Sequence, residues 1–167
     1  MSPVINAGLE TKPTKGAAPE EKIEFREAVE HLKNEYPDKA LPKLRRLFDA
    51  DKKNPFYSSF LGLSLARAEQ KWDEASELCE TAIRINPKEI QFHMNLVEVF
   101  ALAGKRERAL HTVESALKLF GNDARLRRAR NKVIKRRSPV LPFFGRNHFL
   151  NRHLGKWRHK LLKKFED

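Results

Sequence analysis

The strongest constraint on the fold is a sequence pattern that recurs after 34 residues. Residues 72–75 (Trp-Asp-Glu-Ala) align with residues 106–109 (Arg-Glu-Arg-Ala), and the same offset relates Ala82 to Ala116. A fixed period of this length is typical of proteins built from one repeated supersecondary unit. The sequence therefore predicts an array of similar units that bury a continuous core.

Each copy ends at a helix-breaking pair, Asn86-Pro87 in one and Phe120-Gly121 in the next. Leu61 and Leu96 mark the first helix of each copy. Leu61 precedes Ala75 by 14 residues, whereas Leu96 precedes Ala109 by 13. We therefore expect one extra residue in the turn 69–71.

A weaker copy precedes these two, and a further helix follows them. Residues 36–40 begin the second helix of the weaker copy, and residues 20–34 carry apolar side chains at helical spacing. Residues 122–137 predict a last helix that caps the array, as terminal repeats require.

The period, the small residues at positions 75, 82, 109 and 116, and the Leu61-Gly62 pair resemble the tetratricopeptide-repeat family. The resemblance implies an all-α solenoid of helical hairpins, with alanines that let paired helices approach closely. We expect a disordered tail at 1–19, repeats at 20–55, 56–88 and 89–121, the capping helix at 122–137, and a linker with a basic amphipathic helix at 138–167.

Several classes of protein are disfavoured by composition. Residues 1–22 lack the apolar core of a secretory signal, and no stretch approaches the roughly 20 apolar residues of a membrane span. Cys79 is the only cysteine, so no internal disulfide forms. We expect a cytoplasmic protein.

Catalytic and metal-binding patterns are missing from the sequence. Cys79 shares a helix face with Ala75 and Ala82, which predicts a buried packing residue. His31, His93 and His111 are isolated in sequence, and the three histidines near the C-terminus would point around a helix rather than toward one metal. We therefore predict no enzyme activity, no cofactor and no small-molecule substrate.

The family resemblance implies a groove lined by the first helix of each repeat, in which a partner peptide binds. When the groove positions of the family are transferred to the same places in the repeats of this chain, the groove residues are Phe56, Ser59, Leu63, Arg67, Gln91, Met94, Asn95, Glu98, Arg125 and Arg128. Some family members hold acidic peptides with a clamp of Lys, Arg and Asn. Asn95 with Arg125 and Arg128 is faintly similar, but the matching cations of earlier repeats are missing, and solvated helix residues are the alternative.

Positive charge is concentrated at the C-terminus. Residues 1–124 hold 19 Lys/Arg and 20 Asp/Glu, whereas residues 125–167 hold 15 and 2. Residues 148–165 place leucines, Trp157 and Phe165 on one helical stripe beside basic residues. We name as candidate basic-tail residues Arg152, Lys156, Trp157, Lys160, Lys163 and Lys164. The stripe could pack on the repeats, bind a membrane or a protein, or contact nucleic acid.

The sequence as a whole predicts an adaptor that binds a peptide of another protein, possibly acidic and partly apolar, in the groove. The alternative is peripheral binding to an anionic membrane or to nucleic acid through residues 125–167. The segments 139–143 and 150–155 are also similar to the tails of bacterial repeat proteins, which suggests a bacterial origin and no particular function.

Overall fold

The computed structural model describes residues 18–134. Within this range the chain forms seven α-helices and no strand: α1 (Pro19–Lys33), α2 (Pro37–Ala50), α3 (Pro55–Ala68), α4 (Trp72–Ile85), α5 (Ile90–Leu102), α6 (Arg106–Phe120) and α7 (Ala124–Ile134). The predicted all-α fold is confirmed. The predicted N-terminal tail and the C-terminal linker and helix lie outside the described residues, apart from the start of α1.

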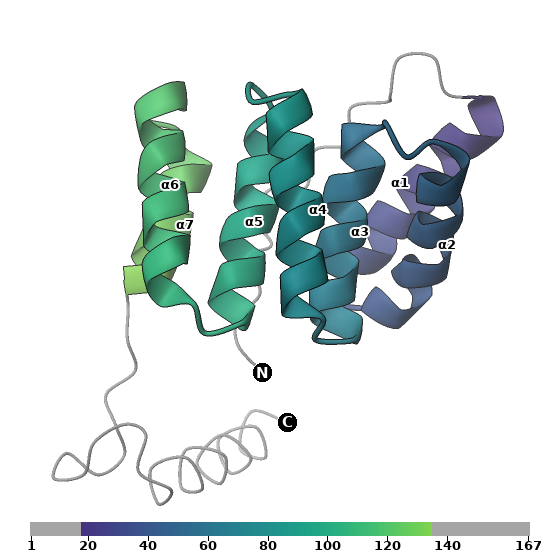
Figure 1. Ribbon diagram of the computed structural model, residues 1–167, viewed down its shortest axis with the longest axis horizontal. Coiled ribbons are helices and arrows are strands. Elements are labelled where there is room, and N and C mark those ends of the chain that lie inside the picture. The colour runs from purple at the N-terminus through teal and green to yellow at the C-terminus, as the bar shows by residue number, and fades with distance from the viewer. Residues whose placement is uncertain (1–17, 135–167) are drawn as a thin grey trace, which may run out of the picture. The chain divides into compact units, whose positions relative to one another are not determined.

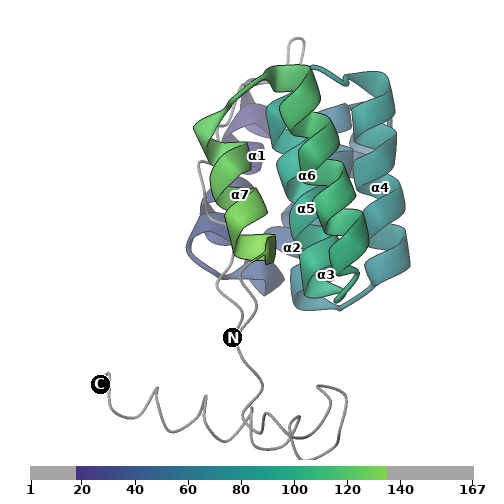
Figure 2. The ribbon, with the colours of Figure 1, turned by 90° about the vertical axis from the view of Figure 1, so that its left-hand side faces the viewer.

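The helices form antiparallel hairpins stacked in two layers. α2, α4 and α6 lie side by side toward the viewer in Figure 1, and α1, α3 and α5 lie behind them. Each first helix packs against its own partner and against the second helix of the preceding hairpin: α3 contacts α4 and α2, and α5 contacts α6 and α4. Figure 2, turned by 90°, shows α7 beside α6 at the end of the stack, where it packs on α6 and α5.

The two helices of each hairpin are joined by a turn of three residues. One residue in each turn has a left-handed backbone conformation: Glu35 (φ 61°), Gln70 (φ 56°) and Gly104 (φ 75°). The extra residue that we expected in the turn 69–71 is therefore not there. It lengthens the helix instead, because α3 has 14 residues and α5 has 13.

Side-chain caps fix where the inner helices begin. The Asn54 Oδ1 accepts a hydrogen bond from the Phe56 N–H (3.1 Å), and the Glu89 Oε1 accepts one from the Gln91 N–H (3.4 Å). These caps satisfy amide groups that the first turn of a helix leaves without partners. They set α3 and α5 at equivalent starting points, 35 residues apart.

Small residues allow α3 and α4 to approach closely, as the repeat pattern predicts. A Cβ atom at Gly62 would lie 2.6 Å from the Ala75 carbonyl oxygen and 2.9 Å from the Cys79 Sγ. Cys79 is fully buried, and its thiol donates to the Ser59 carbonyl oxygen (3.5 Å). The predicted packing role of Cys79 is confirmed.

The inner helices α3 and α5 are buried on every side. In α3 the ten successive residues 57–66 are buried, and in α5 the ten residues 91–100. Ten residues make almost three turns, so no side of either helix faces solvent. The outer helices differ: α4 buries only Ala75, Ser76, Cys79 and Ala82, one strip of an amphipathic helix.

The predicted capping helix corresponds to α7, which is shorter than 122–137 in the described part of the chain. Its buried residues are Leu126 and Ala129. The Asp123 Oδ1 accepts hydrogen bonds from the Arg125 N–H (2.8 Å) and the Leu126 N–H (3.3 Å), which starts the helix. Among the described helices, none has the length and hydropathy to cross a membrane.

The close approach at Gly62 leads to a stability prediction. Gly62→Ala forces the Ala75 backbone away and should lower the free energy of unfolding by about 2 kcal/mol. Gly121→Ala is the control, because the space around Gly121 is open and only its positive φ (69°) is strained, at a cost of about 1 kcal/mol. Urea unfolding followed by circular dichroism measures both. Equal stability of Gly62→Ala and the wild type would contradict the packing account.

Candidate functional site

The predicted groove residues of α3 and α5 form one strip along the contact between these two helices. Ser59, Leu63 and Arg67 recur at a spacing of four on α3, and α5 contributes its own residues at spacings of three and four. We call this strip the inner face and define it by Ser59, Leu63, Arg67, Gln91, Met94, Asn95 and Glu98. All of these are buried except Arg67, which is half-buried as a whole residue.

A chain of polar side chains links α5 to α3 across the inner face. The Gln91 Nε2 donates to the Asn95 Oδ1 (2.7 Å), and the Asn95 Nδ2 donates to the Ser59 Oγ (2.9 Å). Asn95 is 1% exposed and Gln91 4%. The Gln91 Oε1 is buried and has no hydrogen-bond partner within residues 18–134. An unmade bond at such an atom is costly, about 1–3 kcal/mol, so this oxygen is an acceptor suited to a donor from a ligand.

A buried ion pair continues the inner face toward the C-terminal end of α3. The Arg67 guanidinium contacts the Glu98 Oε1 through Nε (2.7 Å) and Nη2 (2.6 Å), and its Nη1 donates to the Leu32 carbonyl oxygen (2.7 Å). The two side chains are 6% and 5% exposed. Burial raises the pKa of the Glu98 carboxyl group, and the charge and hydrogen bonds of Arg67 oppose that shift. The pair joins α3, α5 and α1.

Aromatic side chains bound the N-terminal end of the inner face. Phe56 packs edge-on against Phe92 (ring centroids 4.9 Å) and against Phe25 of α1 (6.4 Å). Phe56 is half-buried, whereas Leu63 and Met94 are buried. Apolar and polar groups therefore alternate along the inner face, which suits a peptide more than a free ion.

The two predicted groove residues of α7 lie in a different setting. The Arg125 guanidinium bonds the Asp123 carboxylate (3.4 Å), and Arg128 is exposed on the helix. The Asn95 amide bonds Gln91 and Ser59, so the clamp-like arrangement with Arg125 and Arg128 stays a prediction. The basic-tail residues 152–164 lie outside the described residues.

The structure reveals one pairing that sequence reasoning missed. Arg67 and Glu98 were both predicted to line the groove, but not as an ion pair. The signal is their phase: they sit 31 residues apart, near the repeat period, on successive inner helices. Opposite charges at facing positions of neighbouring repeats would have indicated the contact.

Burial shifts the pKa values of two titratable groups near the inner face. Burial raises the pKa of the Cys79 thiol to about 12, so it stays protonated at neutral pH. Burial also lowers the pKa of His93, whose Nε2 lies 3.0 Å from the Pro87 carbonyl oxygen. Within the described part of the chain, no three His, Cys, Asp or Glu side chains cluster as metal ligands would.

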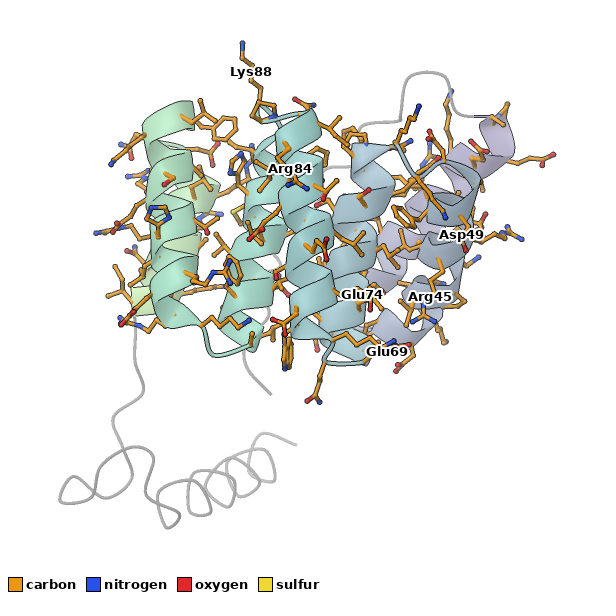
Figure 3. All side chains as sticks on the ribbon, in the orientation of Figure 1. Arg45, Asp49, Glu69, Glu74, Arg84 and Lys88 are labelled. Atoms are coloured by element: carbon orange, nitrogen blue, oxygen red, sulfur yellow. The ribbon has the colours of Figure 1, made fainter. Side chains whose placement is uncertain are left out.

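The outer side of the stack offers two shallower pockets. One of about 220 Å³ is lined by Arg45 and Asp49 of α2 and Glu74 of α4, which Figure 3 labels on the face toward the viewer. The other, of about 370 Å³, is lined by Glu80, Phe100, Arg108 and neighbours. Arg108 lies over the Phe100 ring (4.3 Å) and pairs with Glu80 (3.1 Å). In the larger of these two pockets, the charge of Arg108 is therefore already matched by Glu80.

Comparison with known proteins agrees with this architecture. The family model described as tetratricopeptide repeat matches residues 66–133. No curated protein sequence matches the chain. The chain is similar to the TPR domain of Sgt2 from Aspergillus fumigatus, with a TM-score of 0.60 and 18% identity, over 74% of this chain and 82% of that one.

Two further similar structures contain bound peptides. The second TPR domain of human RPAP3, in complex with the HSP70 peptide SGPTIEEVD, has a TM-score of 0.56 and 19% identity, over 68% of this chain and 93% of that one. The first TPR of Spaghetti (RPAP3), bound to the HSP90 peptide SRMEEVD, has the same TM-score and identity, over 68% and 91%.

The fold and the comparisons define the chain as a helical-hairpin solenoid. Residues 66–133, from the end of α3 to α7, match the tetratricopeptide-repeat family model, and the solved structures that the chain is similar to are TPR domains.

The Arg67–Glu98 pair leads to a stability prediction. Glu98→Ala leaves a buried cation without its partner and should lower the free energy of unfolding by about 3–5 kcal/mol. The double variant Arg67→Met with Glu98→Leu should lose much less stability than the sum of its two single changes. The control is Lys105→Ala, which breaks a pair with the exposed Asp73 (2.8 Å) and should change stability little. Urea midpoints of Glu98→Ala, the double variant, its two single variants Arg67→Met and Glu98→Leu, and Lys105→Ala test this. Additive single changes would show that the pair is not coupled.

Proposed function

We propose that this protein is an adaptor that holds an extended segment of a partner protein against the inner face. The observation that carries the proposal is the buried acceptor at Gln91 Oε1, at the end of the amide chain through Asn95 to Ser59. An extended peptide presents main-chain N–H groups at regular intervals, and one of them would satisfy this oxygen. The apolar side chains of Leu63 and Met94 would accept its side chains.

The charges of the inner face indicate what net charge the bound peptide should carry. The positive charge of Arg67 is already matched by Glu98, so a ligand carboxylate would meet an acid as well as a base there. We infer that the segment is uncharged and partly apolar where it crosses α3 and α5. Acidic residues would be favoured only toward α7, where Arg128 is exposed.

The similar structures support the class of partner. Two of them are RPAP3 domains bound to peptides of HSP70 and HSP90. At 19% identity this likeness concerns the fold, so the partner of the present chain is inferred from its own inner face. Both peptides carry clustered acids, which the neutral Arg67–Glu98 pair does not favour.

A peptide selection tests the proposal. A phage-displayed library of random twelve-residue peptides is selected against the full chain, and the enriched peptides are synthesised for calorimetry. We expect uncharged or weakly acidic sequences with apolar residues. Asn95→Ala removes the central amide and should weaken binding about tenfold or more, the worth of a buried hydrogen bond.

The matched control is Arg84→Ala on α4, whose side chain Figure 3 labels toward the viewer and whose guanidinium donates to the Thr81 hydroxyl. It should bind like the wild type. Circular dichroism must show that Asn95→Ala remains folded. No enriched peptide, or equal binding by Asn95→Ala and the wild type, would contradict the proposal.

A further inference from the structure

The burial of the inner face is not explained by the helices that pack around it. The helices in contact with α3 are α1, α2, α4 and α5, and those in contact with α5 are α3, α4, α6 and α7. In a two-layer array the inner layer has a covering layer on one side only. Yet the residues of α3 and α5 are buried over almost three full turns, including the polar ones of the inner face.

The chemistry of the buried strip indicates what could cover it. Asn95, Gln91 and Glu98 are at most 4% exposed, and burial of polar groups is unfavourable unless they are hydrogen-bonded. An open inner face would let water reach the Gln91 Oε1. A buried inner face instead requires an occupant that brings a donor, and an extended main chain brings one at every second residue along each edge.

The chain itself contains a suitable segment, residues 4–17, which precedes α1 in the sequence. Residues 4–17 lead into α1, which begins at Pro19 and is part of the inner layer. Fourteen extended residues reach about 46 Å, whereas crossing from α1 to α5 over neighbouring helices takes about 20 Å. The segment has apolar residues at Val4, Ile5 and Leu9, one acid, Glu10, and two lysines, Lys12 and Lys15. Its uncharged stretch 4–9 matches the peptide that the neutral inner face favours.

We propose that residues 4–17 occupy the inner face in the free protein and leave it when a partner peptide binds. This inference rests on the proposed function, because it assigns the same face an internal competitor. A tethered segment acts at a high effective concentration and lowers the apparent affinity for every external peptide by the fraction of open molecules. Partners must therefore bind more tightly than the segment does, which makes the adaptor selective.

A distance measurement on the full chain tests occupancy. A nitroxide is attached through Asn6→Cys, and the buried Cys79 does not compete for the reagent. Paramagnetic broadening of the side-chain amide resonances of Gln91 and Asn95 is then recorded, at two protein concentrations. We expect strong broadening that is independent of concentration. The matched control places the nitroxide at Arg84→Cys on the outer layer and should leave both resonances sharp.

A second measurement separates this inference from the proposed function. The full-length triple variant Val4→Ser, Ile5→Ser, Leu9→Ser should bind a selected twelve-residue peptide about five- to tenfold more tightly than the wild type. The control variant Thr11→Ser, Thr14→Ser should not change the affinity.

The outcomes are distinct. Sharp Gln91 and Asn95 resonances, or equal affinity of the triple variant and the wild type for a peptide that both bind, overturn the inference and leave the function standing. Broadening that grows with concentration assigns the occupant to a second copy and also overturns the inference. If no peptide binds any version of the chain, the proposed function fails and this inference fails with it.

Discussion

The close contact of α3 with α4 at Gly62 sets the geometry on which the rest of the structure depends. A single Cβ atom there would collide with the Ala75 carbonyl oxygen, so the two helix axes are nearer than larger residues would allow. Because of this proximity, the inner helices α3 and α5 pack between the outer helices, which exclude solvent from the sides of α3 and α5. Apolar residues are then required on every strip of α3 and α5 that faces another helix. Only the inner face is free to carry a different chemistry.

That different chemistry is a polar strip within otherwise apolar helices. A buried ion pair such as Arg67–Glu98 is seldom more stable than well-packed apolar residues, so stability alone does not account for it. The amide chain from Gln91 to Ser59 likewise ends in an acceptor without a partner in residues 18–134. Polar groups that are buried, oriented by their neighbours and not fully used are the groups expected at a recognition surface.

The sequence predicted the architecture well because the repeat period is a property of local packing. The phase of Ala75, Ala82 and Cys79 was enough to place two hairpins and to assign Cys79 to the core. The period misplaced the extra residue of α3, because helix length depends on where the caps lie. The sequence left two settings open for Asn95, a groove position or a solvated helix residue, because its burial depends on what covers the strip.

Oxidative footprinting of Met94 in the intact chain tests the central claim, that the inner face is closed to solvent, most directly. Met94 lies on this face and is 3% exposed, and methionine oxidation by hydroxyl radicals follows solvent access. The account predicts that Met94 in the folded chain is oxidised about tenfold or more slowly than in the urea-unfolded chain. Oxidation of Met94 at similar rates in the folded and unfolded chain would show an open inner face and contradict the account.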